Sequence, residues 1–165
     1  MKLKIIRYAA FSLEIILLYV LQSASGLIPE LFGSKPVLLI SCALSIAAVD
    51  EVVPSLVFAA VCGALADLSA SGTVGFFAIL LTLVCYALSC LMRYYFNSGA
   101  VAALSLCAAA VVLIFGLHFL LFRLTAGLDG AGELFINHYI SRIVYTFSAA
   151  APLYFLNRFL SRVLQ

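Results

Sequence analysis

Residues 36–67, PVLLISCALSIAAVDEVVPSLVFAAVCGALAD, form two apolar runs separated by the acidic pair Asp50 and Glu51. Pro36 opens the first run and Pro54 the second, and proline is well tolerated in the first turn of a helix. The pattern predicts helices over residues 36–49 and 54–67. Fourteen residues span about 21 Å, less than the roughly 30 Å of a bilayer's hydrocarbon core. The pair therefore either crosses the membrane as tilted or mismatched helices, or forms a re-entrant hairpin with the acidic pair at its tip.

The rest of the chain is equally apolar. Of its 165 residues, 66% are hydrophobic and 10% are charged, and the mean hydropathy is +1.24. A soluble domain carries about 25% charged residues, so this chain needs lipid as its solvent. We predict an all-α integral membrane protein, a single polytopic domain over residues 1–165. Its expected transmembrane helices cover roughly residues 5–24, 36–49, 54–67, 74–92, 99–122 and 139–159.

Lysine and arginine residues predict the orientation of these helices. With the N-terminus inside, the cytoplasmic side holds Lys2, Lys4, Arg7, Arg93, Arg158 and Arg162, and the outer side holds Lys35, Arg123 and Arg142. Because cytoplasmic loops carry the excess of basic residues, this distribution favours both termini in the cytoplasm. The first apolar stretch is interrupted by Glu14 and is not followed by a clear cleavage site, so we expect it to be retained as a helix.

Several classes of function lack support in the sequence. The net charge of +2 and the absence of a basic run argue against nucleic-acid binding. The five cysteines lie inside apolar stretches without a CxxC motif, which is typical of buried free thiols. No Walker loop, HExxH or GxSxG motif occurs, and the two histidines, His118 and His138, are a weak metal signal. We therefore expect neither an enzyme nor a bound metal or cofactor.

Glu14 is the most informative ionisable residue, because it lies about 10 Å along the first helix from Arg7, inside the hydrocarbon. A charge at such a depth costs roughly 2.5 kcal/mol or more, so these residues usually face a partner or a cavity. Two interpretations follow. Glu14 contacts another membrane protein or a polar ligand, or it is protonated and hydrogen-bonded within its own bundle.

Asp67 ends the third expected helix and is followed by small residues that include Gly72 and Gly75. This pattern predicts a tight turn with a carboxylate at the membrane rim. Arg142 should lie at a similar depth on the same side. An Asp67–Arg142 ion pair would lower the insertion cost of both residues, as a structural contact or as part of a ligand site.

Small residues at four-residue spacing predict close helix packing on the third segment. Ala59 and Gly63 form one such pair, and Ala60 and Ala64 form another. This spacing lets helix backbones approach each other in lipid. It leaves open whether the neighbouring helix is internal or belongs to another protein.

Three stretches of the chain resemble the rod shape-determining protein MreD family. They are residues 35–39 (KPVLL), residues 63–68 (GALADL) with the glycine turn from Gly72 to Gly75, and residues 151–154 (APLY) followed by Arg158. The family typically shows a proline-led second helix and a G-x-x-x-D-L helix end before a glycine turn. Chain length and helix number also match. The specific motif covers about forty residues, and Val37 departs from the acidic or polar residue that many members carry there.

The resemblance implies a non-enzymatic component of the elongation machinery in the bacterial cytoplasmic membrane. Its partners would be an MreC-like protein, the actin-like MreB, and the SEDS glycosyltransferase with its class B penicillin-binding protein. Contacts with them would support rod shape and lateral peptidoglycan synthesis. The sensitive positions would be Glu14 and the Gly63–Asp67 helix end.

The family is also similar in fold to the substrate-binding subunits of energy-coupling-factor vitamin transporters, which supplies an alternative function. Such a subunit should carry an Ala-x-x-x-Ala pair on its first helix. The alanines of that segment, Ala9, Ala10 and Ala24, are not spaced by four. The predicted outer loops offer acidic residues, His138 and Arg142 for a polar pocket, so the alternative stays open.

Overall fold

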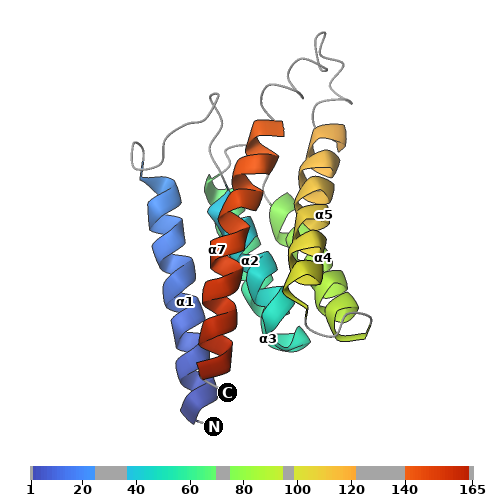
Figure 1. Ribbon diagram of the computed structural model, residues 1–165. Helices are drawn as coiled ribbons and strands as arrows, with labels where there is room; N and C mark the ends of the chain where they lie inside the picture. Colours follow the sequence, from blue (N-terminus) through green and yellow to red (C-terminus); the bar gives the residue numbers. More distant parts are fainter. Residues whose placement is uncertain (1, 25–36, 70–74, 95–98, 122–139, 164–165) are drawn as a thin grey trace.

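The computed structural model describes residues 2–24, 37–69, 75–94, 99–121 and 140–163, and this part of the chain is all-helical. Its helices are α1 (Lys2–Ser23), α2 (Leu38–Val49), α3 (Val52–Ser69), α4 (Phe76–Tyr94), α5 (Ala100–Phe119) and α7 (Ser141–Val163). Successive helices run in alternating directions, and both ends of the chain lie at the same end of the bundle (Figure 1). The predicted helix positions agree with these bounds to within a few residues.

Four of the described helices are long and apolar enough to cross a membrane, namely α1, α3, α4 and α5. The other two differ from them in length or composition. α2 has 12 residues, and α7 has 23 but carries Arg142, Arg158 and Arg162. The four apolar helices indicate a membrane protein, as the composition predicts.

The short helix α2 occupies the centre of the bundle. It contacts each of the other five described helices, and ten of its twelve residues are buried. A helix enclosed by protein does not have to match the thickness of the lipid around the bundle. This position explains how a 12-residue segment, about 18 Å long, serves as a core element.

The α2–α3 pair runs beside α1 over most of its length. At one end, Lys4 and Arg7 contact the turn between α2 and α3. At the other end, the Gln22 side chain accepts a hydrogen bond from the Leu39 amide at 3.4 Å and donates one to Ser69 Oγ at 3.1 Å. The turn between α2 and α3 therefore lies beside the start of α1.

Large apolar side chains cover the outside of the bundle. On α1, an exposed stripe consists of Ile5, Ile6, Leu13, Ile16, Leu17 and Val20, and comparable residues are exposed on α3, α4, α5 and α7. On a soluble monomer such extended apolar surface would be unusual. In lipid these side chains meet hydrocarbon, so the surface agrees with the composition.

Candidate functional site

Gly63 brings the backbones of α3 and α4 into direct contact. A Cβ atom placed on Gly63 would lie 2.5 Å from the Cα atom of Ala78 and 2.7 Å from the carbonyl oxygen of Phe77. Both of these atoms belong to the backbone of α4, so a side chain at position 63 would push the helices apart. Small residues permit this kind of approach in membrane bundles.

Asp67 lies one turn further along α3 and caps the beginning of α4. Its Oδ1 atom accepts a hydrogen bond from the Phe77 amide, and its Oδ2 atom accepts one from the Ala78 amide, both at 3.0 Å. The first amides of a helix have no partner within the helix, and the helix dipole favours a negative charge there. Asp67 is itself buried, so its carboxylate replaces water as the acceptor for these amides.

This geometry corrects the partner that the sequence predicted for Asp67. Among the described residues, no ion pair joins Asp67 to Arg142. The Arg142 guanidinium instead lies over the Phe115 ring, 5.4 Å from its centroid, where α7 begins beside α5. The two backbone donors could not be predicted from the sequence, because the pattern does not place the start of α4 against the end of α3.

Gly75 is the last residue of the connection between α3 and α4. Gly75 has a φ of +87° immediately before α4, a conformation that residues with a side chain rarely adopt. Gly72 lies outside the described residues. Gly63, Asp67 and Gly75 together form what we call the α3–α4 junction, and they are the residues of the G-x-x-x-D and glycine-turn pattern.

Glu14 points into the bundle and joins a polar contact between three helices. Its Oε1 atom accepts a hydrogen bond from Asn157 Nδ2 at 3.3 Å, and the same Nδ2 donates to Ser45 Oγ at 2.8 Å. The contact links α1, α7 and α2. The Glu14 Oε2 atom is buried, and no described residue forms a hydrogen bond with it. This arrangement favours the interpretation of Glu14 as a protonated group within its own bundle.

A buried ion pair joins the start of α1 to the turn between α2 and α3. Arg7 Nη2 lies 2.8 Å from Asp50 Oδ1, and the side chains are 6% and 1% exposed. The Glu51 amide also donates to Asp50 Oδ1, at 2.8 Å. Burial raises the pKa of the Asp50 carboxyl above its ordinary value, and the Glu51 amide and the Arg7 charge oppose that shift.

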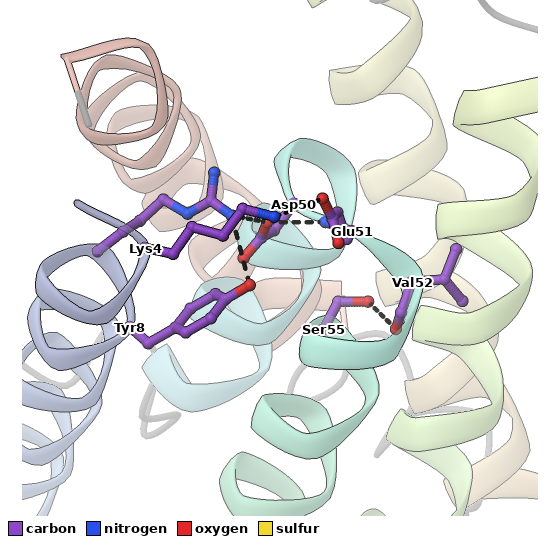
Figure 2. Close-up of polar contacts among 7 residues, drawn as sticks. Lys4, Tyr8, Asp50, Glu51, Val52 and Ser55 are labelled. Atoms are coloured by element: carbon purple, nitrogen blue, oxygen red, sulfur yellow. Dashed lines mark hydrogen bonds and ion pairs between the residues drawn. The ribbon is translucent and has the colours of Figure 1, made fainter. Parts of the chain in front are cut away.

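The surroundings of this pair are visible in Figure 2, where Asp50 and Glu51 face Lys4 and Tyr8 of α1. Arg7 Nη2 also donates to the Tyr8 hydroxyl at 3.5 Å. The neighbouring Lys4–Glu51 pair is 3.4 Å long, and both of its side chains are more than half exposed. Exposed ion pairs contribute little to stability, so the Arg7–Asp50 pair is the more important of these two contacts.

Hydroxyl groups attach α2 to its neighbours. Ser41 Oγ donates to the Thr146 carbonyl of α7 at 2.6 Å. Ser89 Oγ of α4 donates to the Ala47 carbonyl at 2.8 Å and lies 3.1 Å from Ser55 Oγ of α3. Hydrogen bonds between helices stabilise membrane bundles because lipid offers no alternative partner. These serines were not predicted as contacts, although polar residues in apolar runs were a signal for them.

An apolar groove lies between α3 and α4 on the surface of the bundle. Its volume is about 540 Å³, and it is lined by Leu56, Ala60, Ala78, Ile79, Thr82, Leu83 and Tyr86. The two small-residue pairs of α3 lie on different faces of that helix. Ala59 and Gly63 are buried inside the bundle, whereas Ala60 lines the groove and Ala64 is exposed.

The described residues contain no group of three histidine, cysteine or acidic side chains that could hold a metal ion. Four cysteines are buried and Cys90 is half-buried, and all five are free thiols. His118 stacks on the Phe77 ring, with 5.3 Å between ring centroids. His138 lies outside the described residues.

Comparisons of the chain with protein-family models, with curated proteins and with solved structures found no match.

Proposed function

We propose that this chain is a non-enzymatic membrane scaffold of the bacterial elongation machinery, which holds partner proteins through its membrane helices. The observation that carries the proposal is the α3–α4 junction. Gly63 and Asp67 fix two helices against each other, and the groove formed between them faces outward. A closely packed helix pair with an apolar groove is suited to binding another membrane helix.

The occupant of the groove in this proposal is a transmembrane helix of an MreC-like partner. Ala60 and Ala78 give the groove a floor of small side chains, and Ala64 continues the small-residue row along α3. Such rows let a second backbone approach closely, and van der Waals packing then drives association. The resemblance to the MreD family supports the identity of the partner. MreB and the cell-wall synthase pair would bind the same assembly.

The proposed topology has six membrane-crossing helices in the cytoplasmic membrane, with both termini in the cytoplasm. We propose that the fold resembles that of energy-coupling-factor substrate-binding subunits. Two observations support this topology. The termini lie at the same end of the bundle, and that end also carries Lys4, Arg7, Arg93, Arg158 and Arg162. α2 would cross within the protein, shielded from the lipid by its neighbours.

Site-specific photo-cross-linking tests the proposed partner surface. A photoreactive residue at Leu83 samples the groove, and one at Val112 of α5 samples a similarly exposed apolar site elsewhere, the two side chains being 62% and 54% exposed. We expect an MreC-like protein to cross-link at position 83 and not at position 112. Equal cross-linking at both positions, or lipid adducts alone, would contradict the assignment of the groove.

A further inference from the structure

A second cavity, of about 260 Å³, opens at the end of the bundle where the termini lie. It is lined by Ala48, Val49, Met92, Tyr154, Arg158, Ser161 and Arg162. The contributing elements are the end of α2, the end of α4 and the last turns of α7. The cavity is distinct from the apolar groove between α3 and α4.

The lining of this cavity consists of an apolar wall and a polar wall. Ala48, Val49 and Met92 supply an apolar wall at the ends of α2 and α4. α7 supplies the polar wall, where Tyr154, Arg158 and Arg162 follow one another at four-residue intervals and therefore share one helix face. A site of this kind matches a ligand with a negative charge next to an apolar body.

The two arginines of this wall have different environments. Arg158 Nη1 donates to the Tyr154 hydroxyl at 3.2 Å, and its guanidinium lies 5.8 Å from the centroid of the Tyr154 ring. These contacts orient the guanidinium at the cavity. Arg162 is exposed at the mouth, and the Ser161 residue between them is buried.

The described acidic residues at this end of the bundle are engaged elsewhere. Asp50 pairs with Arg7, and Glu51 pairs with Lys4. Phosphate groups are the anions that arginine recognises best, because the guanidinium offers several parallel donors.

We propose that this cavity binds the phosphate of an anionic phospholipid, with Arg158 and Arg162 on the headgroup and the apolar wall against its glycerol and acyl portion. Basic pockets between membrane helices bind anionic headgroups in this way. The site does not depend on the scaffold function. In the proposed topology it selects lipids of the cytoplasmic leaflet, such as phosphatidylglycerol.

The test measures thermal unfolding of the purified full chain in detergent while short-chain lipids are added. We expect dioctanoyl-phosphatidylglycerol to stabilise the protein, and neither dioctanoyl-phosphatidylcholine nor inorganic phosphate to match it. Arg158→Gln combined with Arg162→Gln should weaken the apparent affinity about tenfold or more. Arg93→Gln, which removes one positive charge at the same end but outside the cavity, should leave the affinity within about twofold of the wild type.

Each contrary result overturns the proposal. Equal stabilisation by inorganic phosphate would assign a soluble anion instead of a lipid, and equal stabilisation by phosphatidylcholine would remove the role of charge. An equal loss of affinity in Arg93→Gln would show a general effect of surface charge. If the double variant does not fold, Arg162→Gln alone serves, because Arg162 is exposed and lies outside the Tyr154 contact. Unchanged affinity in that variant would also overturn the proposal, which places Arg162 on the headgroup.

Discussion

Gly63 and Ala78 place two helix backbones in contact, since a Cβ atom on Gly63 would lie 2.5 Å from the Ala78 Cα atom. The amide of the same Ala78 donates a hydrogen bond to Asp67, one turn further along α3. Steric fit and capping therefore act on the same residue of α4. This relationship explains the G-x-x-x-D pattern in physical terms. The glycine lets the backbones of α3 and α4 approach each other, and the aspartate accepts hydrogen bonds from the amides at the start of α4.

Gly63→Ala should destabilise the protein by about 2 kcal/mol or more, because the new methyl group meets backbone atoms that cannot rotate away. Gly116→Ala is the matched control, since a Cβ atom at that position has nothing within 4 Å. We expect the control to be neutral or slightly stabilising through its gain in helix propensity. Thermal unfolding of both variants in the same detergent measures the difference. Equal stability of the two variants would refute the close approach.

Asp67→Ala should cost about 2 kcal/mol, because two amides at the start of α4 lose their acceptor inside the protein. Asp67→Asn keeps one acceptor oxygen and should lose less. In cells we expect Asp67→Ala to impair elongation or to lower the level of the protein. Microscopy measures cell shape and immunoblotting measures the protein level. Normal cell shape together with a normal protein level would contradict the role of Asp67.

Glu14→Gln should retain most of the stability of the wild type, because the amide is a neutral isostere of a protonated carboxyl group. Glu14→Ala should destabilise the bundle by about 1–3 kcal/mol, since Asn157 then loses a partner in a buried site. Unfolding measurements on both variants test this difference. If Glu14→Gln were as unstable as Glu14→Ala, Glu14 would have to be charged in the folded protein.

Arg7→Met should cost about 3–5 kcal/mol, because it leaves Asp50 buried without its counter-ion. Arg7→Met combined with Asp50→Leu should recover much of that loss. Lys4→Gln is the control on the exposed neighbouring pair and should cost less than about 1 kcal/mol. A double variant as unstable as Arg7→Met would argue against a direct Arg7–Asp50 pair.

The same pair predicts a pH dependence. The pKa of the buried Asp50 carboxyl is raised in the folded protein, and removing Arg7 removes one of the groups that oppose the shift. A carboxyl group with a raised pKa binds its proton more tightly in the folded state than in the unfolded state, so lowering the pH favours folding. The stability defect of Arg7→Met should therefore shrink between about pH 8 and about pH 5. A defect that grows over this range would contradict the assignment.

Much of the fold could be predicted from the sequence, because apolar runs and their Pro, Gly and charged boundaries are local signals. The helix over residues 36–49 was expected, and α2 covers Leu38–Val49. Its central position was not predicted, because hydropathy does not distinguish a lipid-facing helix from one enclosed by protein. The Arg7–Asp50 pair was missed for a similar reason, since it depends on how α1 packs against a turn more than forty residues away.

The candidate site was predicted in part. Asp67 and Gly63 were singled out from their spacing, but the predicted Arg142 partner was wrong, because charge complementarity alone does not reveal available backbone donors. For Glu14, both interpretations were left open by the sequence, and the Asn157 contact favours the internal one. Asn157 itself carried no local signal, since a single amide in an apolar segment does not show which helix it faces.

The most direct test of the scaffold function is affinity purification of the tagged protein in mild detergent, followed by mass spectrometry of the proteins recovered with it. Wild type should be compared with Ala60→Phe, which fills the groove, and with Ala109→Phe, which places the same side chain on an exposed site of α5. We expect MreC-like and cell-wall synthase partners with the wild type and with Ala109→Phe, and their loss with Ala60→Phe. Recovery of ATPase subunits with a transmembrane coupling protein would contradict the scaffold function and assign the chain to a vitamin transporter.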